Sequence, residues 1–181
     1  MAAACETRDA APRKPSRPAR YGLGHAPSAQ EIAVIDIDVN AAGAGLPAGQ
    51  GTAATGALVF ATKCAACHGP HGEGIDKNPK LIGRDPPPGF VFATDAKAPK
   101  TIGNYWPYAT TLYDYIHRAM PLNAPGSLTP DEVYGLTAFL LSENGIVPAG
   151  TVVDRTSLPK VKMPAQSRFV TDNRKGGAEF R

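Results

Sequence analysis

The chain has 181 residues, of which 43% are hydrophobic and 19% are charged, which is typical of a soluble globular protein with one compact domain and tails. No stretch of about 18 apolar residues occurs, so we expect no transmembrane segment. The net charge of +3 is unevenly spread, because residues 31–154 carry seven Lys and Arg residues against twelve acids while both ends are basic. Since no nucleic-acid motif accompanies the basic ends, we expect solvated arms and no nucleic-acid partner.

The N-terminal part of the chain shows little regular pattern. Residues 1 to about 28 are rich in Ala, Pro and Arg and have no apolar periodicity, which predicts a flexible or draped arm. Over residues 31–39, "EIAVIDIDV", the alternation of apolar residues supports only a short strand. We therefore expect an N-terminal extension over residues 1–49, a compact domain over residues 50–146, and a C-terminal extension over residues 147–181 that wraps the domain or trails from it.

The first predicted helix covers about Thr52 to Cys64 and leads into an unusual motif. Gly56 and Phe60 stand four residues apart and therefore share one face of this helix. The motif is Cys64-Ala65-Ala66-Cys67-His68, and it contains two of the three cysteines of the chain. An odd cysteine count argues against a disulfide framework.

Three other chemistries use two closely spaced cysteines. A structural zinc site needs four Cys or His ligands, and the sequence has no second cysteine pair. A thioredoxin-type redox pair follows a strand, whereas the residues before Cys64 are predicted to be helical. A c-type haem attachment site remains, in which Cys64 and Cys67 form thioethers with the haem and His68 is the proximal iron ligand. One helical turn would bring both sulfurs and the imidazole to the same edge of the haem.

Two more helices are predicted after the motif. One covers about Thr110 to Ala119, and its expected apolar stripe consists of Leu112, Tyr115, Ile116 and Ala119. The last begins with a capping box, with Thr129 as the N-cap, Pro130 at the first helical position and Glu132 three residues after the cap. It is expected to end near Asn144 and Gly145.

The distal position of the iron has two candidate ligands. Met120 directly follows the second predicted helix and is favoured, and Met163 in the C-terminal extension is the runner-up because its segment must fold back to the iron. The other histidines, His25, His71 and His117, are more simply interpreted as surface residues. If a methionine binds, the protein transfers electrons; if the position is open or exchangeable, the protein is a haem enzyme.

The order of these elements resembles class I cytochrome c, and longer blocks resemble one group within it. "EIAVIDIDV" (31–39), residues 43–74, residues 101–147 and "LPKVKMP" (158–164) are similar to the cytochrome c subunits of bacterial molybdenum-containing sulfite or sulfur dehydrogenases. The resemblance covers residues 31–165. Those subunits often carry two haems, whereas this chain has a single CxxCH motif.

The resemblance implies an all-α class I cytochrome c fold, with three to five helices around one covalently bound haem c and long irregular extensions at both ends. Cys64 and Cys67 would be the thioether sites, His68 the proximal ligand and Met120 the distal one. Gly56 and Phe60 would meet the last helix around Tyr134 and Phe139. The aromatic residues Tyr105, Trp106 and Tyr108 would pack on the haem, bond a propionate or form an ordinary core patch.

The resemblance also implies a function and a place for it. We expect a single-haem electron carrier, not itself an enzyme, which takes electrons from a sulfite- or sulfur-oxidising dehydrogenase and passes them to a downstream cytochrome or oxidase. The alternative is a peroxidase or a thiosulfate-oxidising cytochrome. Covalent haem is attached outside the bacterial cytoplasm, which predicts a periplasmic protein, although no signal peptide is recognisable in the sequence. "MAAAC" faintly resembles the end of a lipoprotein signal, but an incidental free thiol is the simpler interpretation of Cys5.

Overall fold

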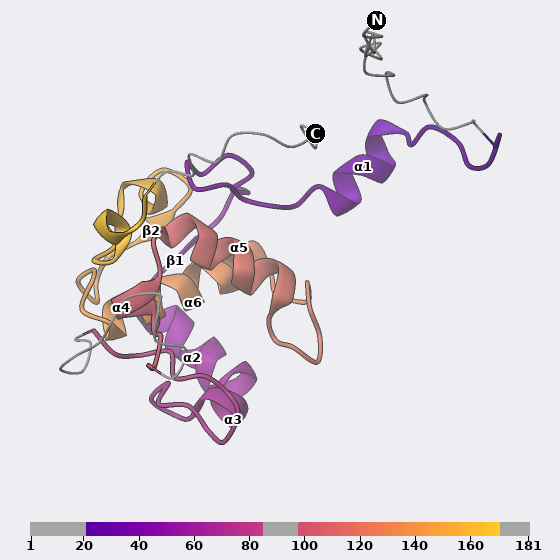
Figure 1. The fold of residues 1–181 in the computed structure, drawn as a ribbon. Helices are drawn as coiled ribbons and strands as arrows, with labels where there is room; N and C mark the ends of the chain where they lie inside the picture. Colours follow the sequence, from indigo (N-terminus) through magenta and orange to yellow (C-terminus); the bar gives the residue numbers. More distant parts are fainter. Residues whose placement is uncertain (1–20, 85–97, 171–181) are drawn as a thin grey trace, which may run out of the picture. The chain divides into compact units, whose positions relative to one another are not determined.

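The computed structural model describes residues 21–84 and 98–170, and the regular secondary structure in these ranges is nearly all helical. The chain divides into two compact units, one ending at Ile35 and the other beginning at Asp36. Within the described ranges, no helix is long and apolar enough to cross a bilayer. In chain order, the elements are α1 (Ala29–Ile35), β1 (Gln50–Gly51), α2 (Ala53–Lys63), α3 (Ala65–His68), α4 (Ile102–Tyr105), α5 (Ala109–Ala119), α6 (Pro130–Glu143), β2 (Val153–Asp154) and the 3-10 helices η1 (Leu158–Lys160) and η2 (Gln166–Arg168) (Figure 1).

The N-terminal unit contains α1, and the strand predicted over residues 31–39 is wrong there. Ser28 and Glu31 form a reciprocal cap: the backbone N–H of Ser28 donates to Glu31 Oε2 (2.7 Å), and that of Glu31 donates to Ser28 Oγ (3.2 Å). Such a cap satisfies backbone donors that a helix would otherwise leave free. The cap therefore decides the secondary structure of this segment in favour of a helix, against the short apolar alternation that favoured a strand.

Helices α2 and α6 cross in direct backbone contact. A Cβ atom on Gly56 would lie 1.9 Å from the carbonyl oxygen of Gly135, so only glycine fits at this point of the crossing. Beside it, the rings of Phe60 and Phe139 have centroids 5.0 Å apart. The expected meeting of Gly56 and Phe60 with the last helix is confirmed at Phe139. The capping box of Thr129 is also confirmed.

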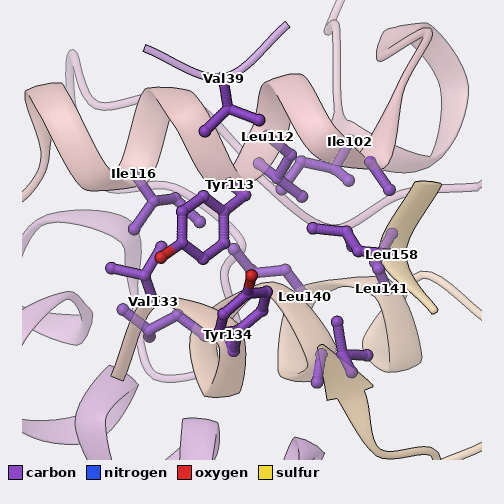
Figure 2. Close-up of a cluster of buried hydrophobic side chains, with 14 of the residues drawn as sticks. Val39, Ile102, Leu112, Tyr113, Ile116, Val133, Tyr134, Leu140, Leu141 and Leu158 are labelled. Atoms are coloured by element: carbon purple, nitrogen blue, oxygen red, sulfur yellow. The ribbon is translucent and has the colours of Figure 1, made fainter. Parts of the chain in front are cut away.

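Helix α5 lies against α6, and the side chains between them form the core (Figure 2). The ring of Tyr113 lies 4.5 Å from that of Tyr134, centroid to centroid, and Tyr113 is fully buried. The predicted apolar stripe of α5 is wrong at one position: Tyr115 is 45% exposed, and the neighbouring Tyr113 is buried in its place. The Tyr115 ring instead packs edge-on against Trp106, with centroids 5.7 Å apart.

Residues after α6 also contribute to this core. Strand β2 pairs antiparallel with β1, with Gln50 opposite Asp154 and Gly51 opposite Val153. Val153, Leu158 and Met163 are each at most 4% exposed and belong to the same hydrophobic cluster as α5 and α6. The segment has no apolar periodicity, so the sequence left open whether it wraps the domain or trails from it, and the described part of it packs on the domain.

Candidate functional site

The motif residues occupy a single turn, α3, at the C-terminal end of α2 (Figure 1). Cys64 is both the C-cap of α2 and the N-cap of α3, and its φ of −123° and ψ of −37° interrupt the helical conformation between them. Its carbonyl oxygen accepts from the N–H of Cys67 (3.1 Å) and of His68 (3.0 Å). The predicted one-turn arrangement of the motif backbone is thus present.

The His68 ring is oriented by a hydrogen bond that the sequence analysis did not identify. His68 Nδ1 lies 3.0 Å from the carbonyl oxygen of Pro79. Because a carbonyl only accepts, Nδ1 carries the proton and Nε2 holds the free lone pair. A metal-binding histidine commonly has this pattern. The eleven residues between the partners explain why no local motif revealed it.

The loop that joins His68 to Pro79 depends on glycine. Gly69, Gly72 and Gly74 have φ angles of 81°, 67° and 84°, a region that other residues rarely adopt. The N–H of Gly74 donates to the carbonyl oxygen of His68 (2.8 Å). The glycines of this loop therefore allow it to turn tightly beside the imidazole.

The Cys64 thiol differs from that of a redox-active cysteine pair. Cys64 is half-buried and packs against the core, and this burial raises its pKa to about 11, although Lys63 opposes the shift. Redox-active pairs instead have cysteines with a lowered pKa. Cys64 is accordingly a neutral thiol at physiological pH, whereas Cys67 is exposed.

The two candidate methionines have different surroundings. Met120 is the C-cap of α5, where its N–H donates to the carbonyl oxygen of Ile116 (3.1 Å), and it is only partly buried at the edge of the core. Met163 is 4% exposed and lies within the core. An iron ligand needs a sulfur that protein atoms do not surround completely. Met120 fits this requirement better.

The other described histidines differ in their surroundings. His25 lies in the N-terminal unit, 3.3 Å from a Glu31 carboxylate oxygen. His71 is exposed. His117 packs against Tyr113 with ring centroids 5.8 Å apart, and His117 Nδ1 and the Tyr113 hydroxyl are buried without a hydrogen-bond partner among the described residues.

The aromatic residues before α5 form their own contacts. Trp106 Nε1 donates to Thr111 Oγ1 (3.0 Å). The Lys100 ammonium lies 5.0 Å from the centroid of the Tyr105 ring. Tyr108 is 36% exposed. These side chains border α5, and their suggested haem contacts stay a prediction.

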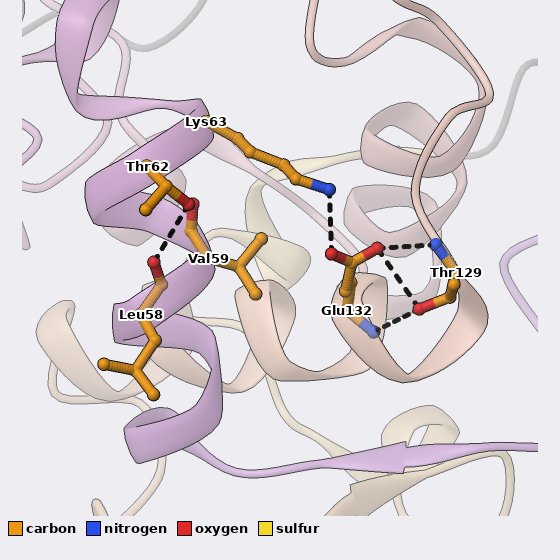
Figure 3. A network of polar contacts seen from close by, with 6 residues as sticks. All are labelled: Leu58, Val59, Thr62, Lys63, Thr129 and Glu132. Carbon is orange, nitrogen blue, oxygen red and sulfur yellow. Dashed lines mark hydrogen bonds and ion pairs between the residues drawn. The ribbon is translucent and has the colours of Figure 1, made fainter.

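An ion pair joins the motif to the start of α6. Lys63, the residue before Cys64, donates to Glu132 Oε1 (2.8 Å). The other carboxylate oxygen of Glu132 accepts from the N–H (2.8 Å) and the hydroxyl (3.2 Å) of Thr129, as Figure 3 shows. Thr129 ends the loop that begins after Met120. The predicted capping residue Glu132 therefore has a second role, as a link between the motif and the Met120 loop.

Two surface cavities lie elsewhere, beside residues 160–162. Their volumes are about 310 and 490 Å³. The first also borders the N-terminal end of α5 at Tyr108 and Thr110. Their linings come from Ala41, the start of α5 and the segment that follows α6, and include no residue of the motif.

Comparisons with known proteins agree with this geometry. The family model described as cytochrome c matches residues 53–144, which include the motif, Met120 and all of α6. A chain of the crystal structure of the sulfane dehydrogenase SoxCD from Paracoccus pantotrophus is 41% identical, with a TM-score of 0.74. The match covers 85% of this chain and 73% of that one. No curated protein sequence matches significantly.

Proposed function

The chain belongs to the cytochrome c family, as a class I c-type cytochrome, and on that premise we propose that it is the single-haem electron-transfer subunit of a sulfur-compound dehydrogenase. One observation carries this proposal: 41% identity over 85% of the chain to a component of a sulfane dehydrogenase. The family implies a covalently bound haem c. One CxxCH motif supports a count of one.

The residues present fit a covalent haem. Cys64 and Cys67 would bind it through thioethers, and His68 would bind the iron through Nε2. The neutral thiol of Cys64, the single helical turn and the proton on His68 Nδ1 all support this assignment. Met120 would be the distal ligand, with Met163 as the runner-up.

The bound haem supplies reversible one-electron chemistry, and the protein's own residues set its conditions. Pro79 holds His68 in one tautomer through a hydrogen bond of 3.0 Å, which increases the basicity of Nε2. The pair of Lys63 and Glu132 links the motif to the Met120 loop.

The proposed electron donor is a molybdenum-containing subunit that oxidises sulfite or another sulfur compound, and the acceptor is a downstream cytochrome or oxidase. The likeness to a chain of SoxCD supports the donor. The cofactor supports a periplasmic location, because covalent haem is attached outside the bacterial cytoplasm. In this proposal, the dehydrogenase carries out the sulfur chemistry and the cytochrome carries electrons.

Stopped-flow absorbance tests the proposal directly. The haem-loaded protein is mixed with a molybdenum sulfur dehydrogenase subunit and either sulfite or a sulfane substrate. We expect the haem to be reduced only when both dehydrogenase and substrate are present. A haem that the substrate reduces without the dehydrogenase would contradict the electron-carrier role, and a haem that stays oxidised in the complete mixture would contradict the proposed donor.

A further inference from the structure

A buried amide side chain at the end of α6 reaches toward the proximal side of the motif. Asn144 is the C-cap of α6 and is 1% exposed. Its Oδ1 accepts from the N–H of Gly83 (2.9 Å). Its Nδ2 donates to the carbonyl oxygens of Leu140 (2.8 Å) and Leu81 (3.4 Å). Asn144 thus joins α6 to a segment about sixty residues earlier in the chain.

That segment, residues 79–84, is called the proximal strap here, because its Pro79 carbonyl accepts the proton of His68 Nδ1. The N–H groups of Leu81 (2.8 Å) and Ile82 (3.2 Å) both donate to the carbonyl oxygen of Gly72. These backbone bonds lie within the loop after the motif. They connect the strap to that loop, but not to the helical core.

Packing and hydrogen bonds connect the strap to the rest of the domain, and the side chains of Leu81 and Ile82 pack against the hydrophobic core. The Thr101 hydroxyl donates to the carbonyl oxygen of Gly83, and the N–H of Ile102 donates to that of Leu81 (3.1 Å). Asn144 supplies two side-chain hydrogen bonds from α6 to the strap, at Gly83 and at Leu81. Helix α6 packs across α2, whose C-cap is Cys64, so the amide of Asn144 attaches the strap to the same pair of helices that holds the motif.

We propose that Asn144 is a positioning residue for the proximal histidine: it fixes the proximal strap, and through the Pro79 carbonyl it sets the orientation and basicity of His68. The inference rests on the proposed function, since His68 must bind the haem iron for its basicity to matter. Hydrogen-bond partners of a metal-bound histidine tune both the ligand and the metal.

The expected consequence has a definite sign. If Asn144 no longer holds Gly83, the strap relaxes and the bond from His68 Nδ1 to Pro79 weakens. The imidazole becomes a weaker base and stabilises ferric iron less. The reduction potential should therefore rise. The Nδ1 proton, which the bond protects, should exchange with solvent faster.

The test compares Asn144→Leu with a matched control on the same helix, Thr137→Val. Thr137 is also fully buried, but its hydroxyl donates within α6, to the carbonyl oxygen of Val133 (2.7 Å). In haem-loaded, reduced, ¹⁵N-labelled protein, we expect Asn144→Leu to speed exchange of the His68 Nδ1 proton about tenfold, as loss of one buried hydrogen bond would. Its reduction potential should also rise. The control should lose stability and change neither quantity.

An unchanged proton exchange rate and potential in Asn144→Leu would overturn the inference. If that variant does not fold, exchange in the unsubstituted protein decides: the Gly83 N–H and the His68 Nδ1 proton should exchange through one opening with the same denaturant dependence. Different denaturant dependences for these two protons would overturn the inference. A different observation would contradict the proposed function: an unsubstituted protein that lacks covalent haem, or in which His68 does not bind the iron.

Discussion

At the residue scale, the two methionines are expected to respond in opposite ways to truncation. Met120→Ala should leave the sixth position open, lower the reduction potential and allow carbon monoxide or cyanide to bind. Met163→Ala should keep the spectrum and reduce the free energy of unfolding by about 2–5 kcal/mol, because Met163 fills the core. Visible spectra and denaturant unfolding measure both effects. A spectral change with Met163→Ala alone would make the C-terminal segment part of the haem site.

Asp114 on α5 gives a pH-dependent contribution to stability. Its Oδ1 accepts from Arg118 Nε and from the N–H of Val39, each at 2.8 Å. These bonds, that to Arg118 first, hold the pKa of Asp114 below its ordinary value of 3.8. The stabilisation is therefore fully present above 3.8 and is lost as the pH falls through the lower pKa of the folded protein.

Asp114→Asn should accordingly lower the free energy of unfolding by about 1–3 kcal/mol at neutral pH, as for a buried bond to a charged group. The difference from the unsubstituted protein should shrink as the pH falls below 3.8. Denaturant unfolding across this range measures it, and the exposed Asp36→Asn serves as the control. A difference that is independent of pH would contradict the role of the charge.

Sequence reasoning at this scale succeeds where the determinant is local. Cys64, Cys67 and His68 lie within five residues, so their spacing alone indicates the chemistry. Pro79 and Asn144 gave no such signal, because their effect on His68 depends on a loop whose path only the folded chain defines.

At the element scale, the crossing of α2 and α6 depends on glycine. In Gly56→Ala the new Cβ would lie 1.9 Å from the backbone oxygen of Gly135, so the helices must separate. We expect a loss of about 1–3 kcal/mol or more in the free energy of unfolding. Gly150→Ala is the control, because no atom lies within 4 Å of its Cβ position. Equal unfolding midpoints for the two variants would show that the crossing tolerates a side chain.

The helices that the sequence predicted best are those with a cap and a periodic face. Helix α6 begins after its predicted N-cap, Thr129, while α2 begins one residue after its predicted start at Thr52 and α5 begins one residue before its predicted start. Helix α1 was missed because a seven-residue segment is too short for helical periodicity to outweigh alternation. Tyr113 was missed as a core residue because its burial depends on Tyr134, which follows 21 residues later.

At the scale of the whole molecule, charge should guide association with the redox partner. The C-terminal segment carries the exposed basic residues Arg155, Lys160 and Lys162. Exposed charges are screened over about 8 Å at physiological ionic strength, so the bimolecular rate of electron transfer should fall as salt is added. Stopped-flow rates at several salt concentrations measure this, and Lys160→Gln should reduce the slope. A rate independent of salt would indicate that apolar contacts carry recognition.

The central claim is that this chain is an electron carrier because it binds one covalent haem whose sixth iron position is occupied by a methionine. It is tested by the visible spectrum of the purified, reduced, haem-loaded protein before and after carbon monoxide is added. The account predicts the sharp, separate α and β bands of a six-coordinate low-spin c-type haem, unchanged by carbon monoxide because Met120 holds the sixth position. A protein without haem bands, or a spectrum that carbon monoxide converts at once, would contradict it, and the second result would favour a haem enzyme with an open site.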